Sequence, residues 1–440
     1  MGKSKIFEND PLYNFLRPYV DLCIKRCYRK IEVIGEENIP TDGAVILTPN
    51  HCNTLMDALV VLRAHKGPTV FGARADMFNN PMVAKIMFFL RILPMVRQRD
   101  GLRNVLKNHQ TQETIVETLE NGVRFCIYPE GRHRAAKSLL PLGKGVFRAA
   151  IAANARFGEE KPVYIVPVGL DYGDFFRFRS TSLLTYGPAI NVTEFVRSLD
   201  TDNEAAMIEP LRKELAGRIS GLFSYIKDDE QLQNKWVLTK MLAIAGQKKG
   251  YGDFRTSLSE GTLRNREIIS ILEGKCISSP ERMSELLQEV SEFDRKRRKK
   301  GISIYSFRKR KPVTDAMAKG VAALLGLPYF IYSAAVASPM WVASAVIRSK
   351  VKDRAFRNTV NLGVRLVLGA LMLPVWAALA FCLAPWWIAL PALLLALPSY
   401  NYFHDYIEGC RRWFSDLRLM GEKKLLKSFD HIVKTYRNID

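Results

Sequence analysis

The chain is best read from one stretch, Ala44-Val-Ile-Leu-Thr-Pro-Asn-His51-Cys-Asn-Thr-Leu-Met-Asp57. Its first four residues are apolar and predict a buried strand, and the apolar residues 59, 60 and 62 predict a helix after it. In α/β proteins, reacting groups are commonly presented where a strand passes into a helix. Histidine is the side chain best suited to proton transfer near neutral pH. The stretch therefore predicts an α/β fold with His51 as a candidate base.

The spacing between His51 and Asp57 limits how the two side chains can meet. In one continuous helix, at roughly 100° per residue, they would point to different sides. They can pair only if His51 lies in a turn and Asp57 lies in the first turn of the helix. Thr54 and Asp57 have the spacing of a capping box, which predicts a helix starting just after Thr54. A purely structural role, with Asp57 as a cap and His51 as a turn residue, is the alternative.

Strands and helices are expected to alternate from residue 31 to about residue 225. We expect strands near 31–34, 44–48, 69–72, 93–96, 123–128 and 163–170, and helices near 54–65, 81–90, 102–120 and 144–155. This order predicts an α/β fold, a mixed sheet flanked by helices, over residues 31–225. Residues 1–30 carry a basic amphipathic helix, which could lie on a membrane surface or pack on the domain.

A second informative stretch, Tyr-Pro-Glu130-Gly131-Arg132-His-Arg134, follows the expected strand at 123–128. Gly131 allows backbone N–H groups to come close to a ligand. Arg132 and Arg134 have planar guanidinium groups that suit phosphate. Glu130 could hold a hydroxyl group or position an arginine. The stretch predicts an anion-binding loop, and a β-turn with surface cations is the alternative.

The composition indicates an anionic partner. The 440 residues have a formal net charge of +21, which suits nucleic acid, an anionic membrane surface or a phosphorylated substrate. The seven cysteines are scattered without a CxxC pair, so we expect reduced thiols rather than disulfides or a zinc site. The first residues contain no apolar segment typical of a secretory signal.

Two long uncharged stretches, 320–347 and 366–403, follow a basic region at 295–311. About 20 residues suffice for one helix to cross a bilayer. Prolines interrupt both stretches, so we expect a re-entrant or interfacial pair from the first and a hairpin of two short helices from the second. Lys and Arg flank both stretches, which places the flanks on the cytoplasmic side. A very apolar soluble helical domain is the alternative.

These patterns divide the second half of the chain into three regions. We expect a charged helical region at 226–311, membrane-embedded or re-entrant helices at 312–405, and a basic cytoplasmic tail at 406–440. The basic blocks are expected to contact anionic membrane lipids. Nucleic-acid binding through 295–311 is not expected, because aromatic residues do not alternate with the cations and no known module is evident.

Together these stretches resemble the PlsC-type glycerophospholipid acyltransferase family over about residues 15–190. The similar blocks, in order, are Pro49-Asn50-His51 with Asp57, Arg97 at the end of a second block, Tyr128-Pro-Glu130-Gly131, and Val166-Pro-Val168. The resemblance implies a glycerolipid-acyltransferase-like fold and His51 and Asp57 as catalytic residues. It also implies substrate contacts, from Asn50, Arg97, Glu130, Gly131, Arg132 and Arg134.

The chain departs from the family pattern at two places. Five residues separate His51 from Asp57, whereas most members have four; the longer spacing is similar to fungal enzymes that acylate glycerol 3-phosphate or dihydroxyacetone phosphate. His133 stands where an arginine customarily binds phosphate, and Arg132 or Arg134 could take over that role.

The resemblance implies a membrane-bound O-acyltransferase of phospholipid synthesis. It would move a fatty acyl chain from acyl-CoA or acyl-carrier protein to a hydroxyl of glycerol 3-phosphate or lysophosphatidate, with the catalytic domain on the cytoplasmic side of the inner membrane. We expect no metal, no other cofactor and no nucleophilic role for Cys52. Backbone N–H groups near the His51 turn or Gly131 are expected to stabilise the oxyanion. Dihydroxyacetone phosphate or an amino-lipid as acceptor, or a non-catalytic protein that binds anionic lipid, are the alternatives.

Overall fold

The computed structural model describes residues 6–64, 67–95, 105–199, 201, 203–246, 257–308 and 312–439. By its internal contacts the chain divides into two compact units. Unit 1 comprises Met1–Phe175 and Thr181–Tyr225, and unit 2 comprises Phe176–Ser180 and Ile226–Asp440. Each unit has a hydrophobic core of its own. The segment 1–30 is therefore part of unit 1.

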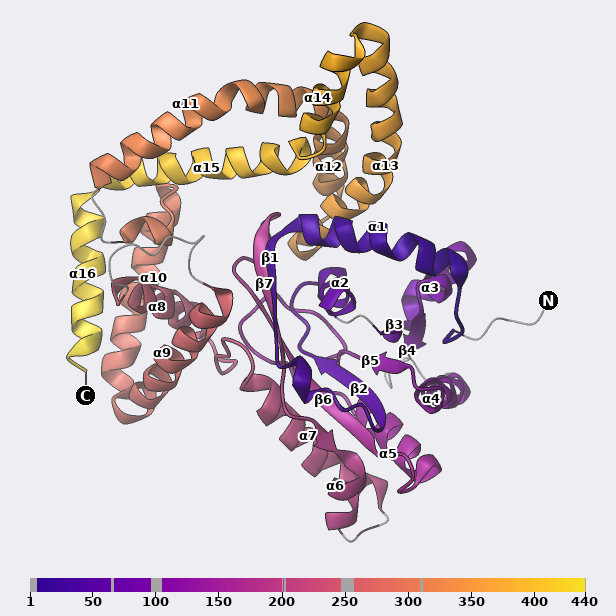
Figure 1. Ribbon diagram of the computed structural model, residues 1–440. Helices are drawn as coiled ribbons and strands as arrows, with labels where there is room; N and C mark the ends of the chain where they lie inside the picture. Colours follow the sequence, from indigo (N-terminus) through magenta and orange to yellow (C-terminus); the bar gives the residue numbers. More distant parts are fainter. Residues whose placement is uncertain are drawn as a thin grey trace. The chain divides into compact units, whose positions relative to one another are not determined.

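Unit 1 is an α/β domain (Figure 1). Its strands are β1 (Tyr28–Ile34), β2 (Ala44–Pro49), β3 (Thr69–Arg74), β4 (Ile92–Met95), β5 (Arg124–Cys126), β6 (Val163–Tyr172), β7 (Ser180–Tyr186) and β8 (Ile190–Asn191). Its helices are α1 (Pro11–Cys27), α2 (Leu55–Ala64), α3 (Pro81–Phe89), α4 (Val105–Glu120), α5 (Gly145–Phe157), α6 (Val192–Ser198) and α7 (Glu204–Ser220).

The strands form one mixed sheet in the order β1-β7-β6-β2-β5-β3-β4, with β8 also paired to β6. The neighbours β6, β2, β5, β3 and β4 are parallel, whereas β7 and β8 run antiparallel to β6. The predicted fold class, a mixed α/β sheet flanked by helices, is confirmed. In a parallel sheet the carboxyl ends of the strands lie at one edge, so the segments after β2, β5 and β6 meet there.

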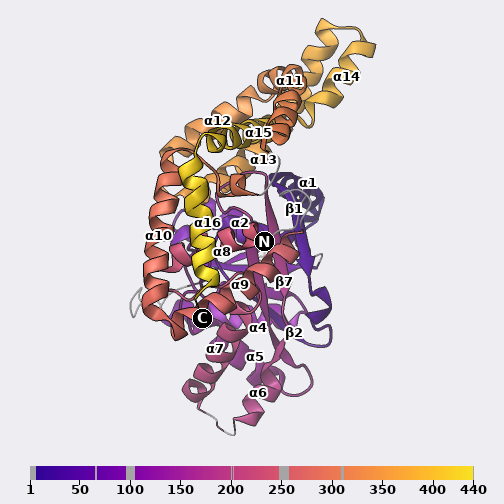
Figure 2. The same ribbon diagram turned by 90° about the vertical axis from the view of Figure 1, so that its left-hand side faces the viewer.

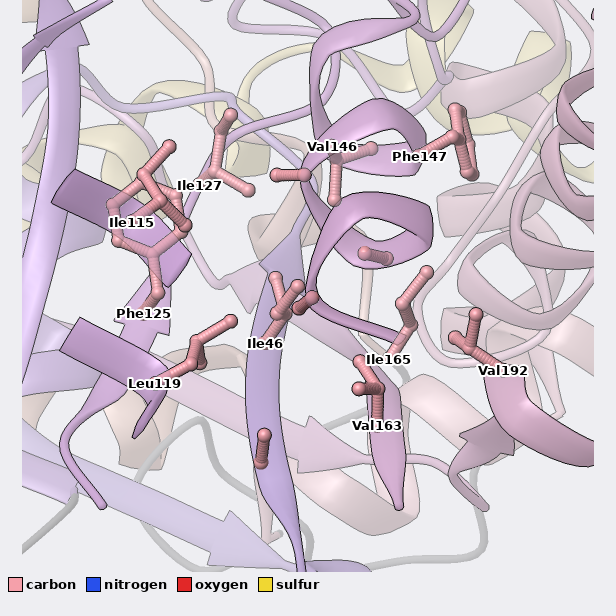
Figure 3. Packing of buried hydrophobic residues seen from close by; sticks show 14 of the residues in the cluster. Ile46, Ile115, Leu119, Phe125, Ile127, Val146, Phe147, Val163, Ile165 and Val192 are labelled. Carbon is pink, nitrogen blue, oxygen red and sulfur yellow. The ribbon is translucent and has the colours of Figure 1, made fainter. Parts of the chain in front are cut away.

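The core of unit 1 fixes this arrangement (Figure 3). Ile46 of β2, Phe125 of β5 and Ile165 of β6 are fully buried on one face of the sheet. Helices α4, α5 and α7 pack over them with apolar side chains, among them Leu119 and Phe147. All six residues of β2 are buried, as expected for a central strand covered on both faces. The polar turn after β2 is therefore mounted on a rigid element.

Over residues 226–246, 257–308 and 312–439, unit 2 is built from helices joined by short turns (Figures 1 and 2). Its helices are α8 (Leu232–Ala245), α9 (Leu258–Ser278), α10 (Pro280–Lys299), α11 (Pro312–Val336), α12 (Ser338–Lys350), α13 (Arg357–Leu383), α14 (Trp386–Ala396), α15 (Ser399–Met420) and α16 (Lys423–Arg437). Helix α11 packs along α15, and aromatic rings such as Phe330 and Tyr406, 4.3 Å apart, stack between them.

The two uncharged stretches break at some of their prolines, whereas Pro328, Pro374 and Pro391 lie inside helices. The first divides into α11 and α12 just before Pro339, and the second turns at Ala384-Pro385 between α13 and α14. Among the residues that the structure describes, two segments are long and apolar enough to cross a bilayer, Val313–Val336 and Arg354–Leu383. In their most apolar parts, 11% and 0% of the residues are buried. The expectation of two short helices in the second stretch is wrong for α13, which has 27 residues because it starts before the uncharged run.

The expected tail at 406–440 is a second correction. Helix α15 runs through residue 405, and α16 packs into the core of unit 2. The buried apolar residues of α16 recur with helical spacing, at Leu425, Phe429, Ile432, Val433 and Tyr436. This periodicity, and not the high content of lysine, decides the structure of the segment.

Candidate active site

His51 and Asp57 form a hydrogen-bonded pair at the carboxyl edge of the sheet. Strand β2 ends at Pro49 and helix α2 begins at Leu55, so His51 lies in the turn and Asp57 in the first turn of the helix. Nδ1 of His51 lies 2.8 Å from Oδ2 of Asp57. The side chain of His51 is 18% exposed, and that of Asp57 is completely buried. The geometry predicted from the spacing is confirmed.

Asp57 also holds the turn itself. Its Oδ2 atom accepts hydrogen bonds from the backbone N–H groups of Cys52, at 2.8 Å, and Asn53, at 2.7 Å. The capping box predicted a helix that starts just after Thr54, and α2 does begin at Leu55; the backbone of Thr54 adopts the left-handed conformation with φ 50°. The structural and the catalytic interpretations of Asp57 are thus compatible, because one carboxylate serves both the turn and the imidazole.

The contacts of Asp57 determine which nitrogen of His51 can accept a proton. All groups around the carboxylate donate to it, so Nδ1 of His51 carries a hydrogen and donates as well. The opposite nitrogen, Nε2, is then the proton acceptor. This is the arrangement in which a carboxylate orients a histidine base.

Two tyrosines complete the pair: Tyr128, which belongs to the block quoted from the sequence, and Tyr172, which the sequence did not single out. The hydroxyl of Tyr172, at the end of β6, donates to Oδ1 of Asp57 at 2.7 Å. The ring of Tyr128, after β5, lies against the imidazole of His51 with the ring centroids 4.3 Å apart. Tyr172 ends β6 and Tyr128 follows β5, both parallel neighbours of β2, and this position was the signal available in the sequence.

Glu130 anchors the site rather than facing a substrate. Its Oε1 accepts the backbone N–H of His51 at 2.6 Å, and its Oε2 accepts the backbone N–H of Leu140 at 2.8 Å. Burial raises the pKa of this carboxyl to about 7, although the two hydrogen bonds act in the opposite direction. The predicted substrate contact is therefore corrected: both oxygens of Glu130 bind backbone groups and connect the His51 turn to the loop after β5.

The prediction that Asn50 contacts the substrate is also corrected. Its side-chain oxygen accepts the N–H of Leu170 at 2.6 Å, and its amide nitrogen donates to the carbonyl of Leu170 at 3.1 Å. The residue is 2% exposed. A predicted substrate ligand is thus a buried clamp between β2 and β6, because both ends of its amide are used on the neighbouring strand.

The loop after β5 brings cationic side chains next to His51. The backbone N–H of Arg134 donates to the carbonyl of His51 at 3.0 Å, and its guanidinium donates to the hydroxyl of Ser138. Arg132 is exposed, and the ring of His133 meets that of His51 edge-on, with centroids 5.6 Å apart. Arg132 and Arg134 therefore stay candidates for binding an anion. Arg97, the remaining predicted ligand, lies outside the described residues.

The predicted oxyanion donors are contradicted at several positions. The backbone N–H groups of His51, Cys52 and Asn53 are bound to carboxylates of the site. Gly131, which has the left-handed φ of 63° that favours glycine, donates its N–H to the carbonyl of Tyr128 at 3.0 Å. These four groups hold the turns in shape and leave the stabilisation of an oxyanion to other donors.

A buried ion pair ties the loop after β5 to β6. Lys137, 4% exposed, binds Asp171, 2% exposed, and also donates to the carbonyl of Tyr172 at 3.1 Å. Asp171 accepts from the backbone and the hydroxyl of Ser224 at 3.0 and 2.7 Å. Burial alone would raise the pKa of Asp171, but Lys137 and Ser224 outweigh burial and hold it below its usual value. The pair was missed because nothing in the local sequence marks it.

The thiol of Cys52 is unsuited to nucleophilic attack. It is 3% exposed, and burial, with Asp57 beside it, raises the pKa of the thiol well above its ordinary value. Within the described part of the chain, no three His, Cys, Asp or Glu side chains are grouped to hold a metal ion.

The comparison with protein families bears on this site directly. Residues 30–171 match the family model described as Acyltransferase, and this range contains His51, Asp57 and the loop after β5. The match to this family model covers about a third of the 440 residues. The match ends at Asp171, one residue before Tyr172, whose hydroxyl binds Asp57.

A curated relative is similar to part of this chain. Over 127 residues the chain is 28% identical to glycerol-3-phosphate O-acyltransferase 2 of Saccharomyces cerevisiae. The aligned part covers 29% of this chain and 17% of the yeast protein. The chain thus matches less than a fifth of the length of that relative.

Among solved structures, the chain is similar to the 1-acyl-sn-glycerophosphate (LPA) acyltransferase PlsC of Thermotoga maritima. The alignment covers 49% of this chain and 81% of that one, at 20% identity and a TM-score of 0.35.

Proposed function

We propose that the chain is a membrane-associated acyltransferase that transfers a fatty acyl group from a thioester to a hydroxyl of a glycerol phosphate. The observation that carries this proposal is the His51–Asp57 pair, partly exposed at His51 and set beside the cationic loop 132–134 within an acyltransferase domain. Acyl-CoA or acyl-carrier protein would be the donor. Glycerol 3-phosphate or lysophosphatidate would be the acceptor.

The transfer follows from the orientation of His51. Nε2 takes the proton of the acceptor hydroxyl while the oxygen attacks the thioester carbonyl. Asp57 keeps Nδ1 protonated and stabilises the imidazolium that forms. The tetrahedral intermediate then breaks its C–S bond, and the imidazolium returns the proton to the leaving thiolate. The acyl group moves directly to the acceptor, without an acyl-enzyme.

Arg132 and Arg134 are the proposed ligands of the acceptor phosphate. Guanidinium groups bind phosphate through two parallel hydrogen bonds, and this geometry would fix the hydroxyl at a set distance from His51. The backbone bond from Arg134 to the carbonyl of His51, 3.0 Å long, supports this arrangement because it joins the cationic loop to the base. Arg97 remains a proposed third ligand.

Association with a membrane is supported by the exposed apolar side chains of several helices. Phe15 of α1 is 79% exposed, Leu325 of α11 is 77% exposed and Leu383 of α13 is 82% exposed. Surfaces of this kind are costly in water and suit hydrocarbon. We propose that these helices hold the enzyme on the cytoplasmic face of the inner membrane, where basic blocks contact anionic lipids.

Incorporation of labelled acyl groups tests the proposal. The full chain in detergent or vesicles is given labelled acyl-CoA or acyl-carrier protein with glycerol 3-phosphate, lysophosphatidate, dihydroxyacetone phosphate or an amino-lipid. We expect a labelled product with a glycerol phosphate and at least a thousandfold loss in His51→Ala, because removal of a base of this type has that effect. His431→Ala, at an exposed histidine of α16, is the control and should stay active.

Two outcomes would speak against the proposal. If no donor and acceptor give a product, the alternative of a non-catalytic protein that binds anionic lipid is favoured. If His51→Ala remains fully active while it folds normally, the assignment of the base is wrong. A product only with dihydroxyacetone phosphate or an amino-lipid would keep the reaction and change the acceptor.

A further inference from the structure

Tyr172 and His51 bind opposite oxygens of the Asp57 carboxylate. The hydroxyl of Tyr172 donates to Oδ1 at 2.7 Å, and Nδ1 of His51 lies 2.8 Å from Oδ2. Oδ2 also accepts the backbone N–H groups of Cys52 and Asn53, so the Tyr172 hydroxyl adds a contact on the opposite oxygen. With both oxygens held, the plane of the carboxylate is fixed, and the position of the imidazole is fixed with it.

Tyr172 is itself held firmly. It is 2% exposed, and its backbone pairs with Ser182 of the antiparallel strand β7. Its N–H binds Oδ1 of Asp171 at 2.8 Å, and its carbonyl accepts from Lys137 at 3.1 Å. The residue that contacts the catalytic carboxylate is thus mounted on the sheet and on the buried ion pair.

We propose that Tyr172 is a positioning residue for acyl transfer, whose hydroxyl locks Asp57 in the orientation that holds His51 as the base. This inference rests on the function proposed above. Burial and the nearby Asp57 raise the pKa of Tyr172 well above its ordinary value, so the hydroxyl keeps its proton and remains a donor. Other titratable groups that act on the same carboxylate or are affected by it lie on several elements: Tyr28, Cys52, Tyr128 and Glu130.

Tyr172→Phe removes the hydroxyl and little else. The loss of this hydrogen bond to a charged group should lower kcat about tenfold to a hundredfold. KM should stay within about twofold of the wild-type value. Without the hydroxyl, the carboxylate carries more negative charge toward His51, so the imidazolium is stabilised. The acid limb of the kcat–pH profile should therefore move to higher pH. A general loss of packing would lower kcat without this shift.

Tyr186→Phe is the matched control. Tyr186 is a buried tyrosine of β7, 1% exposed, in the same sheet, and its backbone pairs with Val168 of β6. The change removes the same atom from a similar environment. We expect wild-type kcat and an unchanged pH profile for this variant, together with unfolding temperatures of both variants that differ by only a few degrees.

A second measurement does not need substrate. Diethyl pyrocarbonate modifies the neutral imidazole, so the pH dependence of His51 modification, followed by peptide mass spectrometry, reports when His51 loses its proton. The midpoint should lie at higher pH in Tyr172→Phe than in the wild type and Tyr186→Phe. If the wild type transfers no acyl group, the proposed function fails, and this titration still tests the inference.

Two results would overturn the inference. The first is an active wild type with kcat and the His51 titration unchanged in Tyr172→Phe. The second is an equal loss of kcat in Tyr172→Phe and Tyr186→Phe without a shift in the titration, since that pattern would reflect packing of the sheet alone.

Discussion

At the scale of single residues, carboxylates determine how the site is built. Asp57 and Glu130 bind three consecutive backbone N–H groups of the turn, those of His51, Cys52 and Asn53. These bonds fix the turn between β2 and α2. The turn is consequently pre-organised before a substrate arrives, which lowers the reorganisation needed during reaction.

Glu130 should make the stability of the fold depend on pH. Its pKa is raised from the ordinary value of 4.5 to about 7 in the folded chain, so folding favours the protonated carboxyl. The resulting contribution to the free energy of unfolding is fully present below about pH 4.5 and is lost as the pH rises through 7. Between pH 5 and pH 8 the wild type should lose about 2 kcal/mol relative to Glu130→Gln. Urea unfolding at both pH values measures this difference. The exposed Glu160→Gln should follow the wild type; the same slope in Glu130→Gln would contradict the assignment.

At the scale of elements, the loop after β5 depends on its anchor to β6. Lys137→Met leaves the carboxylate of Asp171 buried without its cation, and we expect a loss of about 3 kcal/mol or more in the free energy of unfolding at pH 7. The double variant Lys137→Met/Asp171→Asn should cost at least about 1 kcal/mol less than the sum of the single changes. Lys296→Met, at an exposed pair with Glu292, should change the free energy of unfolding far less than Lys137→Met does. Additive costs in the double variant would mean that the two residues do not interact.

Some of these elements and site residues could be predicted from the sequence, and others could not. The apolar run at 44–47 and the helical spacing of the apolar residues after it predicted β2, α2 and the turn between them. Burial of a central strand leaves a clear local signal of this kind. The spacing gave the condition under which His51 and Asp57 can pair, and the resemblance to the family implied the pair. The roles of Asn50 and Glu130 were wrong, because their partners, Leu170 and Leu140, become neighbours only when the chain folds. Tyr172 was missed for the same reason, since 115 residues separate it from Asp57.

At the scale of the whole molecule, we expect α13 to determine whether the protein binds to membranes. Leu379→Glu with Leu383→Glu places charges on an exposed apolar face, and each charge costs about 3 kcal/mol at the centre of a bilayer. The variant should be released from vesicles of anionic phospholipid in a flotation assay. Ile277→Glu, at a residue of α9 that is 84% exposed, is the control and should float with the wild type. Equal flotation of all three proteins would assign membrane binding to another surface.

The five residues between His51 and Asp57 also affect how relatives of this chain can be recognised. The extra residue does not break the bond, because the turn absorbs it before α2 begins and Asp57 still reaches Nδ1. A search pattern that demands a fixed four-residue gap would pass over such chains. A better pattern would allow a gap of four or five residues. It would require an apolar strand before the histidine and a tyrosine at the end of a later strand, and so describe the geometry of the site rather than the number of residues in the gap.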